Sequence, residues 1–337
     1  MDMPKLQFEY YHYNMDPATT IMIDGSGPIP KQLSHWPGTT TPKQYWADSS
    51  TAICLRFLRE ANVAEELAGI THVTNNHYDE DGCLGMLVLL QPERALEYAD
   101  LLQRCAYTGD FSWYEGEDAA KLSLTITYMF DHARSPHRSQ SRKLSEWAHR
   151  NFCYLEFFRE CEQGLLGDLD RYDQLWKGEL AYIQRGIDVV NSDQAEIIAM
   201  PELDLGVLIS QKPLHRIAYS TALRDFERQL VIIRERPNRQ PFATLSYNTR
   251  SFFATTPWFG TLRPDMSPLM QEWNRMENDS QSDDPSWSGP RWQAASQAIP
   301  TPRMRLKDGD SRTRRTSISV DAMIESTCAF LKQAQAT

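Results

Sequence analysis

The segment 77–82, HYDEDG, carries the side chains best suited to chemistry in this chain. If the segment is extended, alternate residues point to the same side, so His77, Asp79 and Asp81 are expected to converge. Two carboxylates that share a site repel each other unless a proton or a cation lies between them. Mixed imidazole and carboxylate ligands suit Mn²⁺, Fe²⁺ or Zn²⁺ better than Ca²⁺. The segment therefore predicts a metal or catalytic site, although Asp-x-Asp-Gly is also common in plain turns.

A second set of potential ligands lies in the loop that follows the β-branched run 19–23. This loop holds Asp24, His35 and Asp48, and Asp110 occurs later, in the sequence TGDF. Taken singly, these residues are explained by a turn, a packed histidine or a helix cap. In open α/β sheets, however, ligands bind beyond the carboxyl ends of strands, which is where the loops holding Asp24 and His77 begin. We therefore expect these residues to share one site.

The elements that must position these loops are predicted from apolar patterning and turn residues. Short strands are expected at 19–23 and 70–74, and a helix at 51–60 capped by Ser49 or Ser50. The apolar run CLGMLVLL at 83–90 predicts a buried helix. Further helices are predicted at 92–107, 118–130, 144–161 and 169–190.

The second half of the chain has a different order of elements. Strands are predicted at 205–210, 229–234 and 242–247, and a last amphipathic helix at 320–333. The region 278–315 is dense in Ser, Asp, Pro and Arg, which predicts a loosely packed, partly disordered excursion. The fold class is therefore α/β, a parallel-sheet core with helices on both faces, plus a helical middle and a smaller α+β C-terminal part. The expected domains are 1–195, 196–277 and a loop with a terminal helix at 278–337.

Composition limits the possible partners and location. The 337 residues carry a formal charge of −10, which argues against long nucleic acid or anionic membrane as partners. The six cysteines form no CxxC pair, which favours buried, reduced thiols. No signal peptide and no apolar stretch of about eighteen residues is recognised, so a cytoplasmic protein is expected.

Two motifs carry a resemblance to a known family. The first is Asp24-Gly25 followed by LSHWPGTTTP and ADSSTAICLRFL, and the second is NNHYDEDGCLG. Together they are similar to the DHH phosphoesterase superfamily over about 95 residues, with the motif order permuted. The triplet itself is Ser34-His35-Trp36, so its Asp and one His are missing. The same motifs also resemble an uncharacterised bacterial family built around LSHWPG and NNHxDxDG.

The resemblance implies a DHH-like core whose two-metal site has as ligands Asp24, His35, His77, Asp79 and Asp81. We add Asp110 as a further candidate ligand, and expect Asp79, Asp81 and His35 to take part in catalysis. In this hypothesis Asp79 or Asp81 bridges two ions, for which Mn²⁺ is the expected metal, and the ions activate water against a phosphoester or nucleotide-type substrate. The alternatives are a nucleotide- or metal-binding module without turnover, or a metal-dependent enzyme that tailors a small metabolite.

An anionic substrate needs cationic groups, and the candidates lie around the strands of the second half. His215, Arg224 and Arg250 are the predicted substrate-binding residues, because an arginine fork matches phosphate oxygens. For each of them an ordinary surface charge is the alternative, and the residues alone favour it. The expected partner is thus a small phosphorylated or nucleotide substrate.

Overall fold

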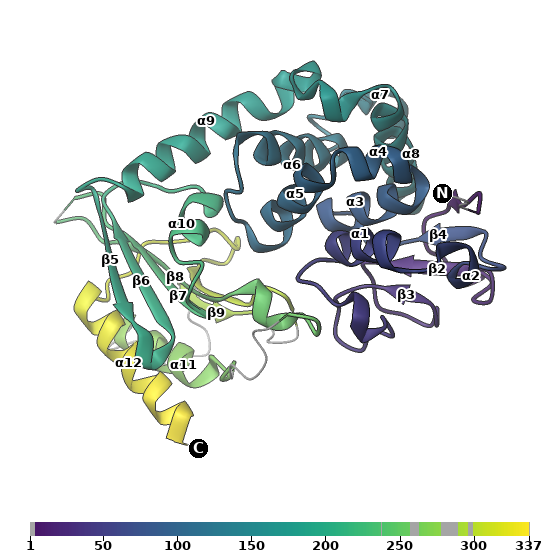
Figure 1. Cartoon of the computed structure of the whole chain (residues 1–337). Coiled ribbons are helices and arrows are strands. Elements are labelled where there is room, and N and C mark those ends of the chain that lie inside the picture. Colours follow the sequence, from purple (N-terminus) through teal and green to yellow (C-terminus); the bar gives the residue numbers. More distant parts are fainter. Residues whose placement is uncertain (1–3, 237, 257–262, 278–288, 296–298, 337) are drawn as a thin grey trace. The chain divides into compact units, whose positions relative to one another are not determined.

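The computed structural model describes residues 4–236, 238–256, 263–277, 289–295 and 299–336. The chain divides into two compact units (Figure 1). Unit 1 comprises Met1–Ala181 and Phe253–Phe259, and unit 2 comprises Tyr182–Phe252 and Gly260–Thr337. The predicted α/β class is confirmed, with a parallel sheet in unit 1 and a mixed sheet in unit 2. The three expected domains stay a prediction.

Unit 1 is built on a small sheet with strand order β1-β4-β2-β3, in which every pairing is parallel. The strands are β1 (Gln7–Phe8), β2 (Thr20–Ile23), β3 (Gln32–Leu33) and β4 (His72–Thr74). Its helices are α1 (Ser50–Glu60), α2 (Val63–Glu66), α3 (Glu80–Leu90), α4 (Pro92–Glu97), α5 (Ala99–Phe111), α6 (Glu117–Phe130), α7 (Arg138–Ser141), α8 (Glu146–Glu162) and the first part of α9 (Asp173–Val190).

Helix α3 is the centre of unit 1, and its sequence explains why. Its residues from Asp81 to Leu89 are all buried, as the apolar run predicts. The helix packs against α1, α5 and the sheet strands. At Gly82 a Cβ atom would lie 2.6 Å from Nδ2 of Asn75, so only glycine allows this close approach of helix and loop. The single helix expected at 92–107 is two helices, α4 and α5, which meet at Tyr98.

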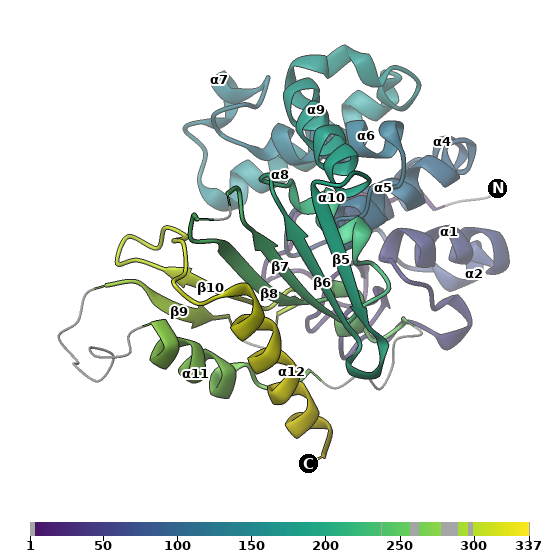
Figure 2. The same ribbon diagram turned by 90° about the vertical axis from the view of Figure 1, so that its left-hand side faces the viewer.

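Unit 2 contains a six-stranded sheet of order β5-β6-β7-β8-β10-β9, in which only β6 and β7 pair in parallel (Figure 2). Its strands are β5 (Ala195–Met200), β6 (Leu205–Ser210), β7 (Arg228–Ile233), β8 (Phe242–Tyr247), β9 (Arg291–Ala294) and β10 (Arg303–Lys307). Its helices, besides the end of α9, are α10 (Arg216–Ala222), α11 (Ser267–Glu277) and α12 (Val320–Ala336). Helices α11 and α12 pack their apolar side chains into one core with β8, β9 and β10.

The prediction of a loose excursion at 278–315 is wrong for its described part, because β9 and β10 lie there and complete the sheet. Alternate residues of β10, Met304 and Leu306, are buried in the core, a period-2 signal that the surrounding polar residues mask in the sequence. Residues 278–288 and 296–298 of that region lie outside the described residues.

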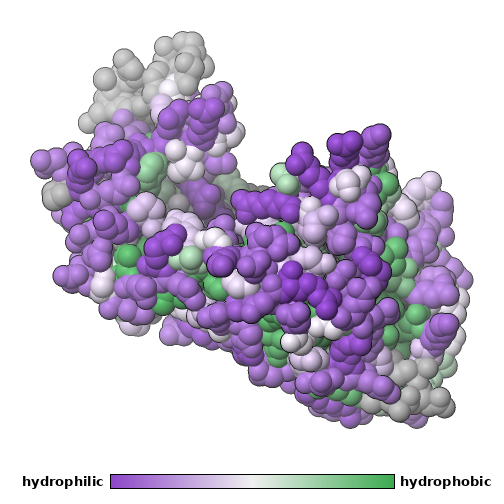
Figure 3. Space-filling view, turned by 90° about the horizontal axis from the view of Figure 1, so that it is seen from above, coloured by the Kyte–Doolittle hydropathy of each residue, from purple (hydrophilic) through white to green (hydrophobic). Residues whose placement is uncertain are grey.

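The hydrophilic surface and the buried cysteines are those expected from the composition. The face in Figure 3 is largely hydrophilic, with hydrophobic side chains in small separate groups. In the described ranges, no helix has the length and apolar character to cross a membrane. All six cysteines are free, and all but Cys328 are buried, as expected.

Candidate metal centre

Three loops of unit 1 meet because three parallel strands end at the same edge of the sheet. Strand β2 lies between β3 and β4, and Asp24 follows β2 directly. His35 follows β3 by two residues, and His77 follows β4 by three. The carboxyl ends of parallel strands share an edge, so the fold brings these side chains together.

Asp24 lies at the centre of the cluster and faces two imidazoles. Its Oδ1 is 3.2 Å from Nε2 of His35, and its Oδ2 is 3.2 Å from Nε2 of His77. The side chain is 1% exposed. Ser50 Oγ and Trp36 Nε1 donate hydrogen bonds to Oδ1, at 2.8 and 3.1 Å. Asp24 therefore belongs to two groups of potential ligands at once.

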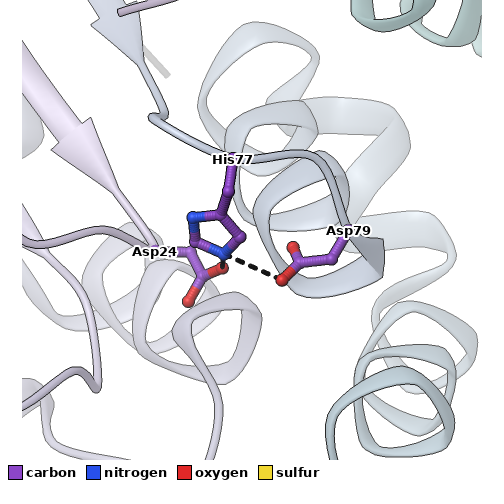
Figure 4. A group of neighbouring side chains, drawn as sticks. All are labelled: Asp24, His77 and Asp79. Atoms are coloured by element: carbon purple, nitrogen blue, oxygen red, sulfur yellow. Dashed lines mark ion pairs between the residues drawn. The ribbon is translucent and has the colours of Figure 1, made fainter. Parts of the chain in front are cut away.

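The outer group consists of Asp24, His77 and Asp79 (Figure 4). His77 Nε2 lies 2.8 Å from Asp79 Oδ2, and their side chains are 28% and 30% exposed. Asp79 also caps helix α3, because its Oδ1 accepts a hydrogen bond of 2.9 Å from the Gly82 amide. Tyr154 fixes the loop by donating its hydroxyl to the carbonyl of His77. This group is open to solvent on one side.

The inner group consists of Asp24, His35 and Asp81, all of them buried. The carboxylate of Asp81 accepts the first amides of α1, from Ser50 at 2.6 Å and Thr51 at 2.8 Å. Ser49 caps this helix by accepting from Ala52, so of the two candidate caps the structure uses Ser49. The inner group thus takes its orientation from a helix N-terminus, where negative charge is favoured.

The expectation that the segment 77–82 is extended, with His77, Asp79 and Asp81 converging on one side, is wrong. The segment 77–82 is not extended throughout, because α3 begins at Glu80 and Asp81 lies in its first turn. Asp79 and Asp81 consequently belong to different groups, and His77 joins only the first of them. The missed signal is the N-cap: Asp79 followed by Gly82 and an apolar run is a helix start.

Asp110, from helix α5, lies beside the inner group. Its Oδ2 is 3.6 Å from Nε2 of His35, and its side chain is 9% exposed. Burial, together with the charges of Asp81 and Asp24, holds the pKa of Asp110 well above its usual range. A carboxyl group in such surroundings stays protonated unless a cation compensates its charge.

The pKa values of the other acidic and histidine side chains in the cluster shift according to the residues that each one faces. Burial raises the pKa of Asp24, but its contacts with His35 and His77 outweigh burial and bring the pKa below its usual value. Burial and the charge of Asp24 raise the pKa of Asp81 to about 6. Burial lowers the pKa of His35, but Asp24 and Asp81 outweigh it and raise the pKa. Burial likewise lowers the pKa of His77, which Asp79 and Asp24 raise well above its usual value.

The donor atoms fit a divalent cation. Four buried atoms here make no hydrogen bond in the structure: Asp24 Oδ2, His35 Nε2, His77 Nε2 and Asp110 Oδ2. Among the described residues, no lysine or arginine pairs with the carboxylates of Asp24, Asp79, Asp81 or Asp110. Unsatisfied buried polar atoms are costly, and a metal ion would satisfy several of them together. The two groups could each hold a metal ion.

A short segment from late in the sequence, 253–256, completes the surroundings of His35. The ring of Phe253 stacks on the ring of His35 with centroids 3.5 Å apart and planes 15° apart. Ala254 donates its amide to the carbonyl of His35 at 2.8 Å, and Thr255 donates to the carbonyl of Ala47 at 2.6 Å. His35 Nδ1 lies 2.9 Å from the carbonyl of Asp48, so the ring is held on its face and on one edge. The sequence offered no signal for this long-range contact.

A third group of possible ligands, His137, Glu156 and Glu160, lies around α8. Here arginines already compensate the charge: Arg159 pairs with both glutamates, and Arg171 pairs with Glu160. This group therefore lacks the charge excess that distinguishes the cluster around Asp24.

The predicted substrate-side residues belong to unit 2. His215 caps α10 by accepting from the amide of Ile217 at 3.1 Å. Arg250 lies in the 3₁₀ turn Thr249–Phe252, and Arg224 is exposed after α10. Substrate binding by these three residues stays a prediction.

The chain belongs to the family described as "Family of unknown function (DUF6687)", whose family model matches residues 5–337. A comparison with curated proteins gives no match. Among solved structures, the chain is similar to one titled "pGpG-specific phosphodiesterase - PggH from Vibrio cholrae". The sequence identity is 9% and the TM-score 0.33, over 79% of this chain and 80% of that one.

Proposed function

We propose that this chain is a metal-dependent hydrolase that acts on a phosphoester or nucleotide-type substrate, with one divalent ion in each ligand group. The observation that carries the proposal is the sharing of Asp24, whose two oxygens face different imidazoles. A carboxylate that faces two groups is suited to bridging a pair of ions. This differs from the sequence-based hypothesis, in which Asp79 or Asp81 was the bridge.

Some side chains of the site would hold the ions on its buried side, and others would face the substrate. Divalent ions, of which Mn²⁺ suits the mixed donors well, would act as Lewis acids on a phosphoryl oxygen and lower the pKa of a coordinated water. Asp81 and His35 would hold the buried side of the site, fixed by the Thr51 amide and the Asp48 carbonyl. His77 and Asp79, which are partly exposed, would face the incoming substrate.

A second candidate function is metal or nucleotide binding without turnover. It is favoured by Trp36, which occupies the last place of the triplet, where the resembling superfamily has a histidine. Its Nε1 donates a hydrogen bond to Asp24 Oδ1 instead of offering a lone pair to an ion. This interaction would compete with a metal ion for one lone pair of the Asp24 carboxylate.

The test is metal content by mass spectrometry after identical Mn²⁺ loading and desalting. The wild type is compared with the double variant His77→Ala/Asp79→Ala, and with Asp131→Ala/His132→Ala as a matched control. The control removes the same two residue types after the end of α6. The proposal expects near-stoichiometric metal in the wild type and the control, and clearly less in the first variant. Equal metal content in all three proteins, or no metal in any of the folded proteins, would refute the proposed site.

A phosphoester screen then separates the two candidate functions. The hydrolase proposal expects Mn²⁺-dependent turnover that Asp79→Ala abolishes without loss of fold. Tight metal or nucleotide binding with no substrate consumed over hours would favour the binding module instead.

A further inference from the structure

Strand β10 presents a row of cationic side chains on one face of the unit 2 sheet. Met304 and Leu306 are 0% and 1% exposed and belong to the core on the face that α11 and α12 cover. Side chains alternate along a strand, so Arg303, Arg305 and Lys307 point to the opposite face. We call these three residues the cationic row.

The cross-strand neighbours of Arg303 and Arg305 are polar and uncharged, whereas Lys307 lies opposite Arg291. In the sheet register Arg303 lies opposite Ser246, and Arg305 lies between Thr244 and Gln293. Arg305 Nε donates a hydrogen bond to Thr244 Oγ1 at 3.3 Å. Directly opposed residues share a face of the sheet, so hydroxyl and amide groups flank the two guanidinium groups.

The cationic row lacks acidic partners. Within the described residues, no carboxylate pairs with its members, whereas other arginines of this unit have one: Arg228 with Asp204, Arg263 with Glu227, Arg314 with Asp308, and Arg315 with Glu235. Burial and the charge of Arg305 lower the pKa of the Arg303 guanidinium. Neighbouring like charges repel each other, and a bound anion would relieve the repulsion.

We propose that the cationic row is a binding site for a phosphate-bearing small molecule, with its anionic groups held between Arg303 and Arg305. Residues two apart on a strand are separated by about 6.6 Å, which lets two guanidinium groups reach one phosphate or two adjacent ones. Each fork can donate two parallel hydrogen bonds to phosphate oxygens. The flanking hydroxyls supply further donors of the kind that phosphate accepts. This site concerns unit 2 alone and does not depend on the metal ions proposed for unit 1.

Inorganic pyrophosphate is a suitable probe, titrated calorimetrically into the full chain after treatment with a chelator. The chelator removes divalent ions, so binding at the metal centre does not contribute. We expect the double variant Arg303→Gln/Arg305→Gln to bind pyrophosphate at least about tenfold more weakly than the wild type, because charge-assisted hydrogen bonds are lost. The matched control is Arg275→Gln, on helix α11, which covers the other face of the sheet. It removes one positive charge and is expected to leave affinity unchanged.

A second variant, Arg303→Lys/Arg305→Lys, keeps the charge and loses the planar forks. An affinity between those of the wild type and the glutamine variant would support recognition by the forks, and it tests the site even if the glutamine variant does not fold. Equal affinity in the wild type and the folded arginine variants would overturn the proposal, and so would a wild type that binds no pyrophosphate at millimolar concentration. Neither of these results bears on the proposed metal-dependent function, which the metal-content measurement tests separately.

Discussion

The two units of this protein concentrate opposite charges. In unit 1, Asp24, Asp81 and Asp110 are buried together and face histidines, with no lysine or arginine paired to them among the described residues. In unit 2, the cationic row on β10 has no paired carboxylate in the described ranges. A chain that only needed to fold would pair such charges with each other or leave them in water. This contrast is what the two proposals, a cation site in unit 1 and an anion site in unit 2, would explain.

Unit 2 also contains a buried carboxylate, Glu227, and this one is paired with an arginine. Glu227 is 0% exposed and lies 3.1 Å from Nε of Arg263. Ser251 donates a hydrogen bond to the same oxygen at 2.6 Å. The buried acid Glu227 thus has an arginine partner, whereas among the described residues no lysine or arginine pairs with Asp24.

The largest effect is expected from Asp24→Asn, which tests whether the cluster is built for cations. This substitution keeps the shape but removes the charge that both ligand groups share. We expect the affinity for Mn²⁺ to fall by more than about a hundredfold, because loss of an outer-shell partner alone typically costs up to that much. Competition with a metal-sensitive dye measures the change. Unaltered affinity in a folded Asp24→Asn variant would show that Asp24 is not a ligand.

The next effect concerns Glu227, the buried carboxylate of unit 2. Burial outweighs Ser251 and Arg263 and raises the pKa of Glu227 to about 7. Between about pH 4.5 and 7 the folded state therefore keeps a proton that the unfolded state releases, so this group's contribution to stability falls as the pH rises through that window. We expect a loss on the order of 3 kcal/mol that Glu227→Gln abolishes. Urea unfolding of both proteins at pH 5 and pH 8 measures it, and an identical pH slope in the variant would refute it.

Phe253→Leu tests how far the geometry of His35 matters to the cation site. The leucine keeps apolar bulk but loses the planar surface that lies on the imidazole. We expect Mn²⁺ affinity to drop by about tenfold, as for other groups that orient a ligand, and Phe253→Tyr to restore it. Phe157→Leu, another buried position in unit 1, is the control for general loss of packing. If both leucine variants lower metal affinity equally, the stacking has no special role.

The smallest effects come from two adjacent serines with different roles. Ser49 caps α1, so Ser49→Ala should cost about 1 kcal/mol of stability with little change in metal binding. Ser50 donates to Asp24, so Ser50→Ala should weaken metal binding by about tenfold. Unfolding curves and metal titrations of both variants separate the two roles. Equal effects of the two variants on metal affinity would mean that Ser50 acts only through the helix.

Local sequence patterns predicted the parts of the fold that depend on local physics. The capped helix after Ser49, the buried helix α3 and the strands β2 and β4 all follow from caps, turns and apolar runs. The proximity of Asp24 and His77 followed from two predicted strands that end at a common edge, whereas the strand before His35 was not predicted. These expectations needed no knowledge of distant contacts.

Other features depended on partners far apart in the chain. The two-residue strands β1 and β3 exist only through pairing with β4 and β2, so no run of their own announces them. Strands β9 and β10 are hidden among charged residues because one face of their sheet is polar. The contact of Phe253 with His35 spans most of the sequence and has no local signature.

The division of the chain has a practical consequence. The sequence passes from unit 1 to unit 2 near residue 181, returns to unit 1 at Phe253 and leaves it again before Gly260. A fragment that ends at residue 181 would contain every carboxylate of the candidate metal centre but lack the ring on His35 and the segment tied to Ala47. Such a fragment would report on an incomplete site. Dissection of this protein should therefore proceed by point substitution in the intact chain.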